Sequence, residues 1–327
     1  MREKKVVLFP FRGSVFLKNN IFNINNGNNI FFGFKDKLKK HGVEINTFDI
    51  HKGVPDWCVY CDVPYPWELN KWRYLIFNKS KSILLCFESP LVNPFSHINL
   101  FLIFFCKVYT WNDRLVDGRK IKKFYIPNTN NGEFEEISFN KKKLLTLINS
   151  NKSTLFLFWL LSPFKIDLYK KRVDAINFFE KELKNDFDLY GKGWDKNKSK
   201  KYFVYKGVIK NDKKSKIDTL SKYKFAICFE NCAADGYVSE KIIDCLEAHV
   251  IPIYYGPKNI TEYIPQNVFV NFEYFKDLES LLSFIKDMTI KEYNLYIKRG
   301  LIFLNSKKFK SLFFEKKFEK TFLESIS

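Results

Sequence analysis

The amino-acid sequence predicts an α/β protein with two parallel-sheet domains in tandem. Short apolar runs alternate with helical patterns along most of the chain, which is typical of parallel strands joined by crossover helices. The 327 residues are enough for two domains of ordinary size. Because 46% of the residues are hydrophobic, each domain can bury a core of its own.

The first domain is expected to open with a strand, helix, strand unit. An apolar run at residues 5–9 follows a charged start and predicts a buried strand. Apolar residues within 31–42 predict a helix that ends at Gly42, and the run at 43–50 predicts the next strand. Further buried strands are expected at 57–63, 82–87 and 107–111.

A second series of elements is expected after a charged helical stretch at 136–150, beginning with the apolar run at 154–161. Its predicted helices cover 169–184, 217–223, 239–249 and 278–288. Its predicted strands cover 188–190, 224–229 and 250–255, with a basic loop at 192–201. We therefore place the two domains at 1–150 and 151–300, followed by a basic, aromatic C-terminal helix at 301–327.

The net charge of +19 points to an anionic partner. Nucleic acid, an acidic membrane leaflet and a phosphorylated small molecule all fit, and the charge alone does not choose among them. An AT-rich genome would produce the same excess of lysine. No helix-turn-helix, RNA-recognition or zinc-finger pattern is present, so we expect no nucleic-acid partner and keep a basic nucleic-acid-binding protein as the alternative of a different class.

The seven cysteines are odd in number and lie mostly in apolar, strand-like runs, which predicts buried reduced thiols rather than a disulfide framework. Cys58 and Cys61 have redox or metal spacing, but no second pair follows them. The apolar run near the N-terminus is too short for a signal peptide, and those at 98–105 and 155–161 are too short to span a bilayer. We expect a cytoplasmic protein that at most rests on the inner face of the membrane.

The segment at 223–257 contains the strongest functional pattern. A buried strand leads into a polar loop, Ser239 follows at the position of a helix N-cap, and an apolar strand returns. In open α/β sheets ligands bind at the carboxyl ends of strands, and helix N-termini attract anions. Five polar side chains would converge there: Glu230, Asn231, Tyr237, Glu240 and Lys241.

This chemistry suits a nucleotide sugar. Lys241 can neutralise a phosphate, Glu240 can accept hydrogen bonds from sugar hydroxyls, and Tyr237 offers a flat face and a hydroxyl. The residues alone leave open an ordinary capped surface helix with a neighbouring Glu-Lys pair.

The same segment resembles the signature of the α-1,3/4-fucosyltransferases, glycosyltransferase family 10. The matching elements are YKF at 223–225, FEN at 229–231, YVSEK at 237–241, and IPI at 251–253 with Gly256 after it. The similarity extends from residue 43 to about 284, loosely at first and closely from Tyr190 onward. It includes DLYG at 188–191, GW at 193–194, YKG at 205–207 and YIP at 263–265.

The resemblance implies the GT-B architecture, in which two Rossmann-like domains face each other across a cleft. It implies GDP-fucose as the donor and Arg172, Asn231, Tyr237, Glu240 and Lys241 as donor-binding residues, with Arg172 on the diphosphate. No Asp-x-Asp motif ends a strand, so we expect no required metal and no further cofactor. A transferase for another GDP-sugar is the nearer alternative.

Glu88 is the candidate catalytic base. It ends an apolar strand in the sequence FESP, where apolar neighbours would raise the pKa of its carboxyl, as suits a general base. The residues alone favour a strand-end glutamate that faces water. The run resembles the Glu-Ser-Pro element of the family, whose glutamate is the proposed base. The resemblance implies an inverting transfer to a GlcNAc-containing oligosaccharide or lipid-linked glycan of surface polysaccharide or lipopolysaccharide, with α-1,3 linkage expected and α-1,4 and α-1,2 open.

The C-terminal residues 306–327 alternate lysines with aromatic residues. Phe314, Phe318 and Phe322 recur every four residues, as on one face of a helix, and a second apolar set lies on another side. Two interpretations follow: a terminal helix packed back against the fold, or a helix that contacts an anionic membrane near a membrane-anchored acceptor.

Overall fold

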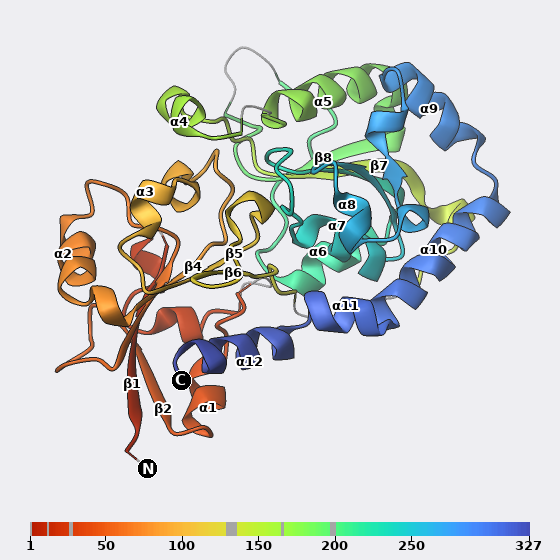
Figure 1. Ribbon diagram of the computed structural model, residues 1–327. Helices are drawn as coiled ribbons and strands as arrows, with labels where there is room; N and C mark the ends of the chain where they lie inside the picture. Colours follow the sequence, from red (N-terminus) through yellow and green to blue (C-terminus); the bar gives the residue numbers. More distant parts are fainter. Residues whose placement is uncertain (1, 12, 26–28, 129–135, 165–166, 197–200) are drawn as a thin grey trace. The chain divides into compact units, whose positions relative to one another are not determined.

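The structure is a computed structural model that describes residues 2–11, 13–25, 29–128, 136–164, 167–196 and 201–327. The chain divides into two compact units (Figure 1). Unit 1 comprises Met1–Pro127, Leu155–Lys165 and Glu315–Ser327, and unit 2 comprises Asn128–Thr154 and Ile166–Phe314. Each unit contains one parallel sheet, so the predicted pair of parallel-sheet domains is confirmed.

The sheet of unit 1 has the order β2-β1-β3-β4-β5-β6, and every neighbouring pair is parallel. Its strands are β1 (Lys4–Phe9), β2 (Val43–Thr47), β3 (Trp57–Cys61), β4 (Ser82–Leu85), β5 (Lys107–Thr110) and β6 (Ile121–Lys123). The helices of the unit are α1 (Phe34–Lys39), α2 (Leu69–Phe77), α3 (Asn99–Leu102), α4 (Phe156–Leu161) and α12 (Glu315–Ser325).

Both faces of this sheet are covered. Along β1, Val6 and Leu8 pack into a cluster with α1 and α12, while Val7 and Phe9 pack into a second cluster with α2, α3 and α4. Successive side chains of a strand point to opposite faces, so the continuous apolar run of β1 is what a doubly covered strand requires.

The sheet of unit 2 has the order β11-β10-β9-β7-β8, again with parallel pairs only. Its strands are β7 (Lys143–Ile148), β8 (Phe187–Tyr190), β9 (Tyr223–Phe229), β10 (Ile251–Tyr255) and β11 (Val270–Asn271). Its helices are α5 (Tyr169–Leu183), α6 (Lys213–Leu220), α7 (Glu240–Glu247), α8 (Ile260–Tyr263), α9 (Leu278–Asp287), α10 (Ile290–Asn305) and α11 (Lys307–Leu312).

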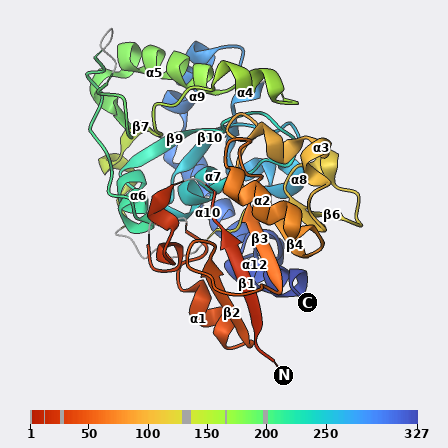
Figure 2. The same ribbon diagram turned by 90° about the vertical axis from the view of Figure 1, so that its left-hand side faces the viewer.

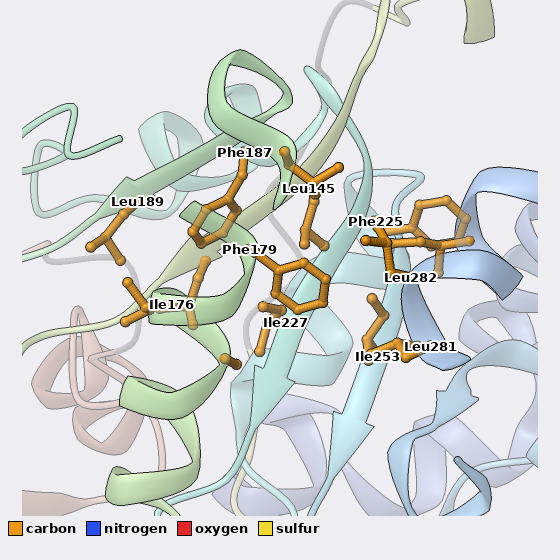
Figure 3. Close-up of a cluster of buried hydrophobic side chains, with 14 of the residues drawn as sticks. Leu145, Ile176, Phe179, Phe187, Leu189, Phe225, Ile227, Ile253, Leu281 and Leu282 are labelled. Atoms are coloured by element: carbon orange, nitrogen blue, oxygen red, sulfur yellow. The ribbon is translucent and has the colours of Figure 1, made fainter. Parts of the chain in front are cut away.

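The core of unit 2 lies between this sheet and the helices α5 and α9 (Figure 3). Ile176 and Phe179 of α5 pack against strand residues such as Ile227, and Leu281 and Leu282 of α9 lie beside Ile253. The helix α7 covers the other face of the sheet, where Cys245 approaches Cys228 of β9 to 3.9 Å between the two sulfurs. The core therefore fixes both β9 and α7, the two elements that flank the predicted site.

The predicted domain boundaries are wrong in three places. Residues 143–148 form β7, which lies between β8 and β9, because this apolar run is a buried strand and not part of a charged helix. The apolar run at 154–161 forms the helix α4 and belongs to unit 1, where Phe158 enters the core. Residues 315–327 also return to unit 1. The predicted loop at 192–201 lies partly outside the described residues.

The C-terminal region is not one helix. Ser306 ends α10 and caps α11, its hydroxyl accepting a hydrogen bond from the Phe309 amide at 3.1 Å. In α12, Phe318 and Phe322 pack on Phe34 of α1, with ring centroids 5.4 and 5.0 Å apart. The interpretation as a terminal helix packed back on the fold is therefore confirmed. Among the described residues, none of the helices combines the length and apolar character needed to cross a bilayer.

We expect Phe322→Ala to destabilise unit 1 by about 3–5 kcal/mol, because it removes a fully buried ring from between α12 and the sheet. Urea unfolding followed by tryptophan fluorescence measures the loss. Phe203→Ala is the matched control, since that ring is 83% exposed and its removal should change the unfolding midpoint very little. Equal effects of the two substitutions would contradict the packing of α12.

Candidate functional site

The structure brings the five predicted donor-binding residues together in unit 2. Asn231 lies two residues after the end of β9, and Tyr237 lies in the loop that leads to α7. Glu240 and Lys241 are the first two residues of α7. Arg172, on α5, reaches the same place, where its Nη2 donates to Asn231 Oδ1 at 2.9 Å. The cluster thus lies at the carboxyl end of the central strand, as the sequence predicts.

A buried carboxylate, that of Glu230, organises this cluster. Glu230 is fully buried and accepts hydrogen bonds from the Ser239 amide at 2.9 Å and from the Ser239 hydroxyl at 2.8 and 2.7 Å. Lys241 Nζ donates to Glu230 Oε2 at 3.0 Å and to the Ser239 hydroxyl at 2.9 Å. Ser239 occupies the N-cap position of α7, but its hydroxyl binds Glu230 and makes no capping bond, which corrects the predicted role.

Arg172 is held in place by the end of β9. Only 3% of it is exposed, and its Nε and Nη2 donate to the Phe229 carbonyl at 3.1 and 2.7 Å. Its guanidinium lies over the Tyr169 ring at 4.9 Å. Within the described part of the chain no acceptor receives a hydrogen bond from Nη1, so one edge of the planar fork is available for an anion.

Glu240 is ionised at neutral pH, because its neighbours lower the pKa of its carboxyl. Burial raises the pKa of its carboxyl, but the positive charges of Lys241 and Lys216 outweigh burial and lower this pKa to about 2. Lys216, on α6, lies 3.9 Å from Glu240 and 2.6 Å from the buried carboxylate of Asp244. Lys216 was not predicted from the sequence, where it is one of many lysines. It can be found only from the contact between α6 and α7.

Lys213 extends these ion pairs away from the cluster. It is 4% exposed and pairs with Glu247 at 2.6 Å, while its Nζ also donates to Asn128 Oδ1 at 3.0 Å. Burial raises the pKa of Glu247 to about 7, although the charge of Lys213 opposes the rise. These pairs fasten α6 to α7 and so fix the direction in which the first turn of α7 points.

Glu88 lies in unit 1, just after β4, and its backbone is held from two sides. The amides of Phe87 and Glu88 donate to the carboxylate of Asp62, the latter at 3.2 and 3.3 Å. Burial, and next the charge of Glu88, raise the pKa of Asp62 well above its ordinary value. The Glu88 carbonyl faces His97 Nε2 at 3.0 Å.

His97 is neutral at physiological pH, because burial lowers its pKa to about 4. Its Nδ1 lies 3.3 Å from the side-chain amide of Asn112, and its ring packs on Trp111 with centroids 4.8 Å apart. With Asn112 as the donor to Nδ1, the proton is on Nε2 and donates to the Glu88 carbonyl. The sequence prediction missed both Asp62 and His97.

The seven cysteines are free thiols, as expected, and six of them are buried. Cys58 and Cys61 belong to the two clusters on opposite faces of the sheet, so they do not form one site. Burial raises the pKa of Cys58 to about 12, which leaves it protonated.

Comparison with solved structures supports the fold class of a glycosyltransferase. A crystal structure of an α1,3-fucosyltransferase with GDP-fucose matches 99% of this chain and 90% of its own, with a TM-score of 0.56 and 17% identity. An α-glucosyltransferase in complex with UDP-glucose and DNA containing an abasic site matches 99% of both chains, with a TM-score of 0.59 and 11% identity. The predicted GT-B fold is confirmed.

Sequence comparison narrows the class to one family for the part of the chain that holds the cluster. Residues 149–299 match the model of the glycosyltransferase family 10 (fucosyltransferase) C-terminal domain. Over 73 residues the chain is 44% identical to an α-(1,3)-fucosyltransferase of Helicobacter pylori. The matched stretch covers 22% of this chain and 15% of that relative. The predicted resemblance to family 10 is confirmed for residues 149–299, which are similar to the C-terminal domain of that family.

We expect Lys216→Met to raise the pKa of Glu240 by about 1–3 pH units, because it removes one of the two cations that keep this carboxyl ionised. The Glu240 carboxyl of the native chain should stay ionised down to pH 3.5, whereas that of the variant should titrate above that pH. Carbon NMR of the Glu240 carboxyl measures the pKa in both proteins, and Glu240→Gln assigns the signal.

Lys214→Met is the control, since Lys214 is an exposed neighbour on the same helix. A native carboxyl that titrates at the ordinary glutamate pKa would contradict the assigned charge.

The same charge sets the sign of a stability effect. Because the pKa of Glu240 is lower in the folded state, Glu240 stabilises the fold above its unfolded pKa and loses that contribution as the pH falls towards 2.

Proposed function

We propose that the chain is an inverting fucosyltransferase that moves L-fucose from GDP-fucose to a hydroxyl of a GlcNAc-containing glycan. The observation that carries the proposal is the cluster at the end of β9, which lies inside the family 10 domain. Transferases with different nucleotide sugars share the fold, so the fold does not choose the donor. The sequence match to fucosyltransferases favours GDP-fucose.

In the proposed reaction, Arg172 and Lys241 bind the diphosphate, and Asn231, Tyr237 and Glu240 bind the nucleotide sugar. Glu88 takes the proton from the acceptor hydroxyl as its oxygen attacks the anomeric carbon. The bond from this carbon to the GDP oxygen breaks, GDP leaves with the electron pair, and the β-linked donor gives an α-fucoside. The two cationic side chains stabilise the charge that develops on GDP, so no divalent metal or further cofactor is required.

The acceptor that we propose is an oligosaccharide or a lipid-linked glycan of surface polysaccharide or lipopolysaccharide, joined by an α-1,3 linkage. A lipid-linked acceptor at the inner face of the cytoplasmic membrane would place the enzyme in the cytoplasm, in peripheral contact with anionic lipid. The H. pylori relative, an α-(1,3)-fucosyltransferase, supports the linkage.

The decisive assay measures turnover of GDP-fucose, GDP-mannose and GDP-glucose with lactose, N-acetyllactosamine and lacto-N-biose as acceptors, with and without EDTA. We expect transfer from GDP-fucose alone, unaffected by EDTA. Glu88→Gln should lower kcat by about 10²–10⁴-fold, because it removes the general base, and should leave GDP affinity nearly unchanged.

Glu324→Gln is the matched control, since it neutralises an exposed carboxyl of the same unit. Near-native turnover of Glu88→Gln would overturn the base assignment. Transfer from another GDP-sugar, or nucleic-acid binding at physiological salt without any transfer, would overturn the proposed donor.

A further inference from the structure

One side of unit 1 exposes large apolar side chains on three neighbouring elements. We define this apolar face as the exposed residues of 67–77, 99–103 and 155–161, on and beside α2, α3 and α4. The most exposed are Phe77 at 77%, Phe156 at 76% and Leu69 at 72%. Trp67, Leu100 and Leu160 are each more than half exposed as well.

The three helices are neighbours in the fold of unit 1. Trp72 of α2 packs on Phe101 of α3, with ring centroids 6.1 Å apart. Trp67 lies parallel to Phe158 of α4, with centroids 6.4 Å apart. Both α3 and α4 contact the 3-10 turn Pro94–His97. In Figure 1 the three helices follow the left-hand edge, and Figure 2 turns this edge towards the viewer.

The core does not explain these side chains. Within the apolar run 155–161, Phe158 is the residue that enters the core of unit 1, while Leu155, Phe156 and Leu157 are each more than half exposed. Folded proteins rarely expose contiguous apolar patches of this kind unless the patch binds a protein, a ligand or a membrane. The face therefore requires an occupant.

The charges around the apolar face favour an anionic occupant. On α2, the exposed Arg73 lies between Leu69 and Phe77 on the same helical face, and the exposed Lys79 follows the helix. The segment 64–82 has Glu68 as its one carboxylate, and Glu68 is paired with Lys71 at 2.7 Å. The segments 94–106 and 154–164 contain no Asp or Glu.

We propose that this apolar face docks on the surface of an anionic lipid bilayer. Its leucine and phenylalanine side chains would enter the boundary between headgroups and acyl chains, Trp67 would lie at the level of the headgroups, and Arg73 and Lys79 would contact anionic headgroups. A second copy of the chain is disfavoured as the occupant, because a symmetric contact would bring two basic rims together.

This inference assigns a location to the membrane contact of the proposed function. The basic C-terminal tail does not supply it, because Phe318 and Phe322 are buried in the core of unit 1. Only the measurement of lipid binding tests the lipid contact. If the chain failed to transfer fucose, the proposed function would be wrong but the lipid contact would not be affected.

The test is co-sedimentation of the full chain with vesicles of phosphatidylglycerol and phosphatidylethanolamine, compared with vesicles of phosphatidylcholine alone. We expect binding to the anionic vesicles and at least about tenfold weaker binding after the triple substitution Phe77→Ser, Phe156→Ser and Leu160→Ser, which removes three inserting side chains. Arg73→Gln with Lys79→Gln should weaken binding by about fivefold for each lost charge.

Matched controls separate this surface from others. Phe203→Ser, Val208→Ser and Ile290→Ser remove exposed apolar side chains of unit 2 and should leave vesicle binding unchanged. Circular dichroism verifies that each variant is folded. Quenching of tryptophan emission by brominated phospholipid gives an independent readout, which Trp67→Phe should diminish.

Three results would overturn the proposal. The native chain could fail to bind anionic vesicles, or the triple substitution could leave binding intact while Lys316→Gln with Lys317→Gln in the tail abolishes it. Light scattering could also show a dimer that the triple substitution dissociates, with vesicle binding unchanged, which would make the face a contact between copies of the chain.

Discussion

The geometry of the proposed donor site depends on one interaction, the burial of the Glu230 carboxylate against Ser239 and Lys241. An ionised carboxylate is stable inside a core only when donors surround it, and here a backbone amide, a hydroxyl and an ammonium group do so. Because these donors come from the start of α7, the bonds tie this helix to the end of β9. Arg172 then anchors α5 to the adjacent Phe229 carbonyl. Three elements thus converge on one point.

Much of the fold follows from the sequence because apolar runs mark parallel strands that are buried on both faces. In the second domain, the sequence predicts β8, β9, α7, β10 and α9 close to their observed bounds, but it does not predict α10 at Ile290–Asn305. The sequence-based prediction is wrong where an apolar run fits more than one structure. Residues 143–148 are predicted as part of a helix but form the strand β7. Residues 154–161, the expected first run of the second series, contain the helix α4, which belongs to unit 1. Periodicity describes a segment alone, whereas these outcomes depend on which sheet the segment meets.

The site also contains residues that one segment of the sequence reveals and residues that only the contacts between segments reveal. Asn231, Tyr237, Glu240 and Lys241 lie in one continuous motif, so the sequence reveals them, and Arg172 was found by family resemblance. Lys216 and Asp62 act through contacts between elements that are distant in sequence. Asp62 follows β3 where its register with β4 sets it beside Phe87 and Glu88, a relation that could have been derived once the strand pairing was known.

The most direct test of this account is the affinity for GDP of the Glu230→Gln variant, measured by isothermal titration calorimetry with Glu182→Gln, a substitution on α5, as the control. If the buried carboxylate holds Lys241 and the start of α7 in the binding geometry, the variant should remain folded but bind GDP about 10–100-fold more weakly than the native chain. Native affinity in the Glu230→Gln variant would contradict the account.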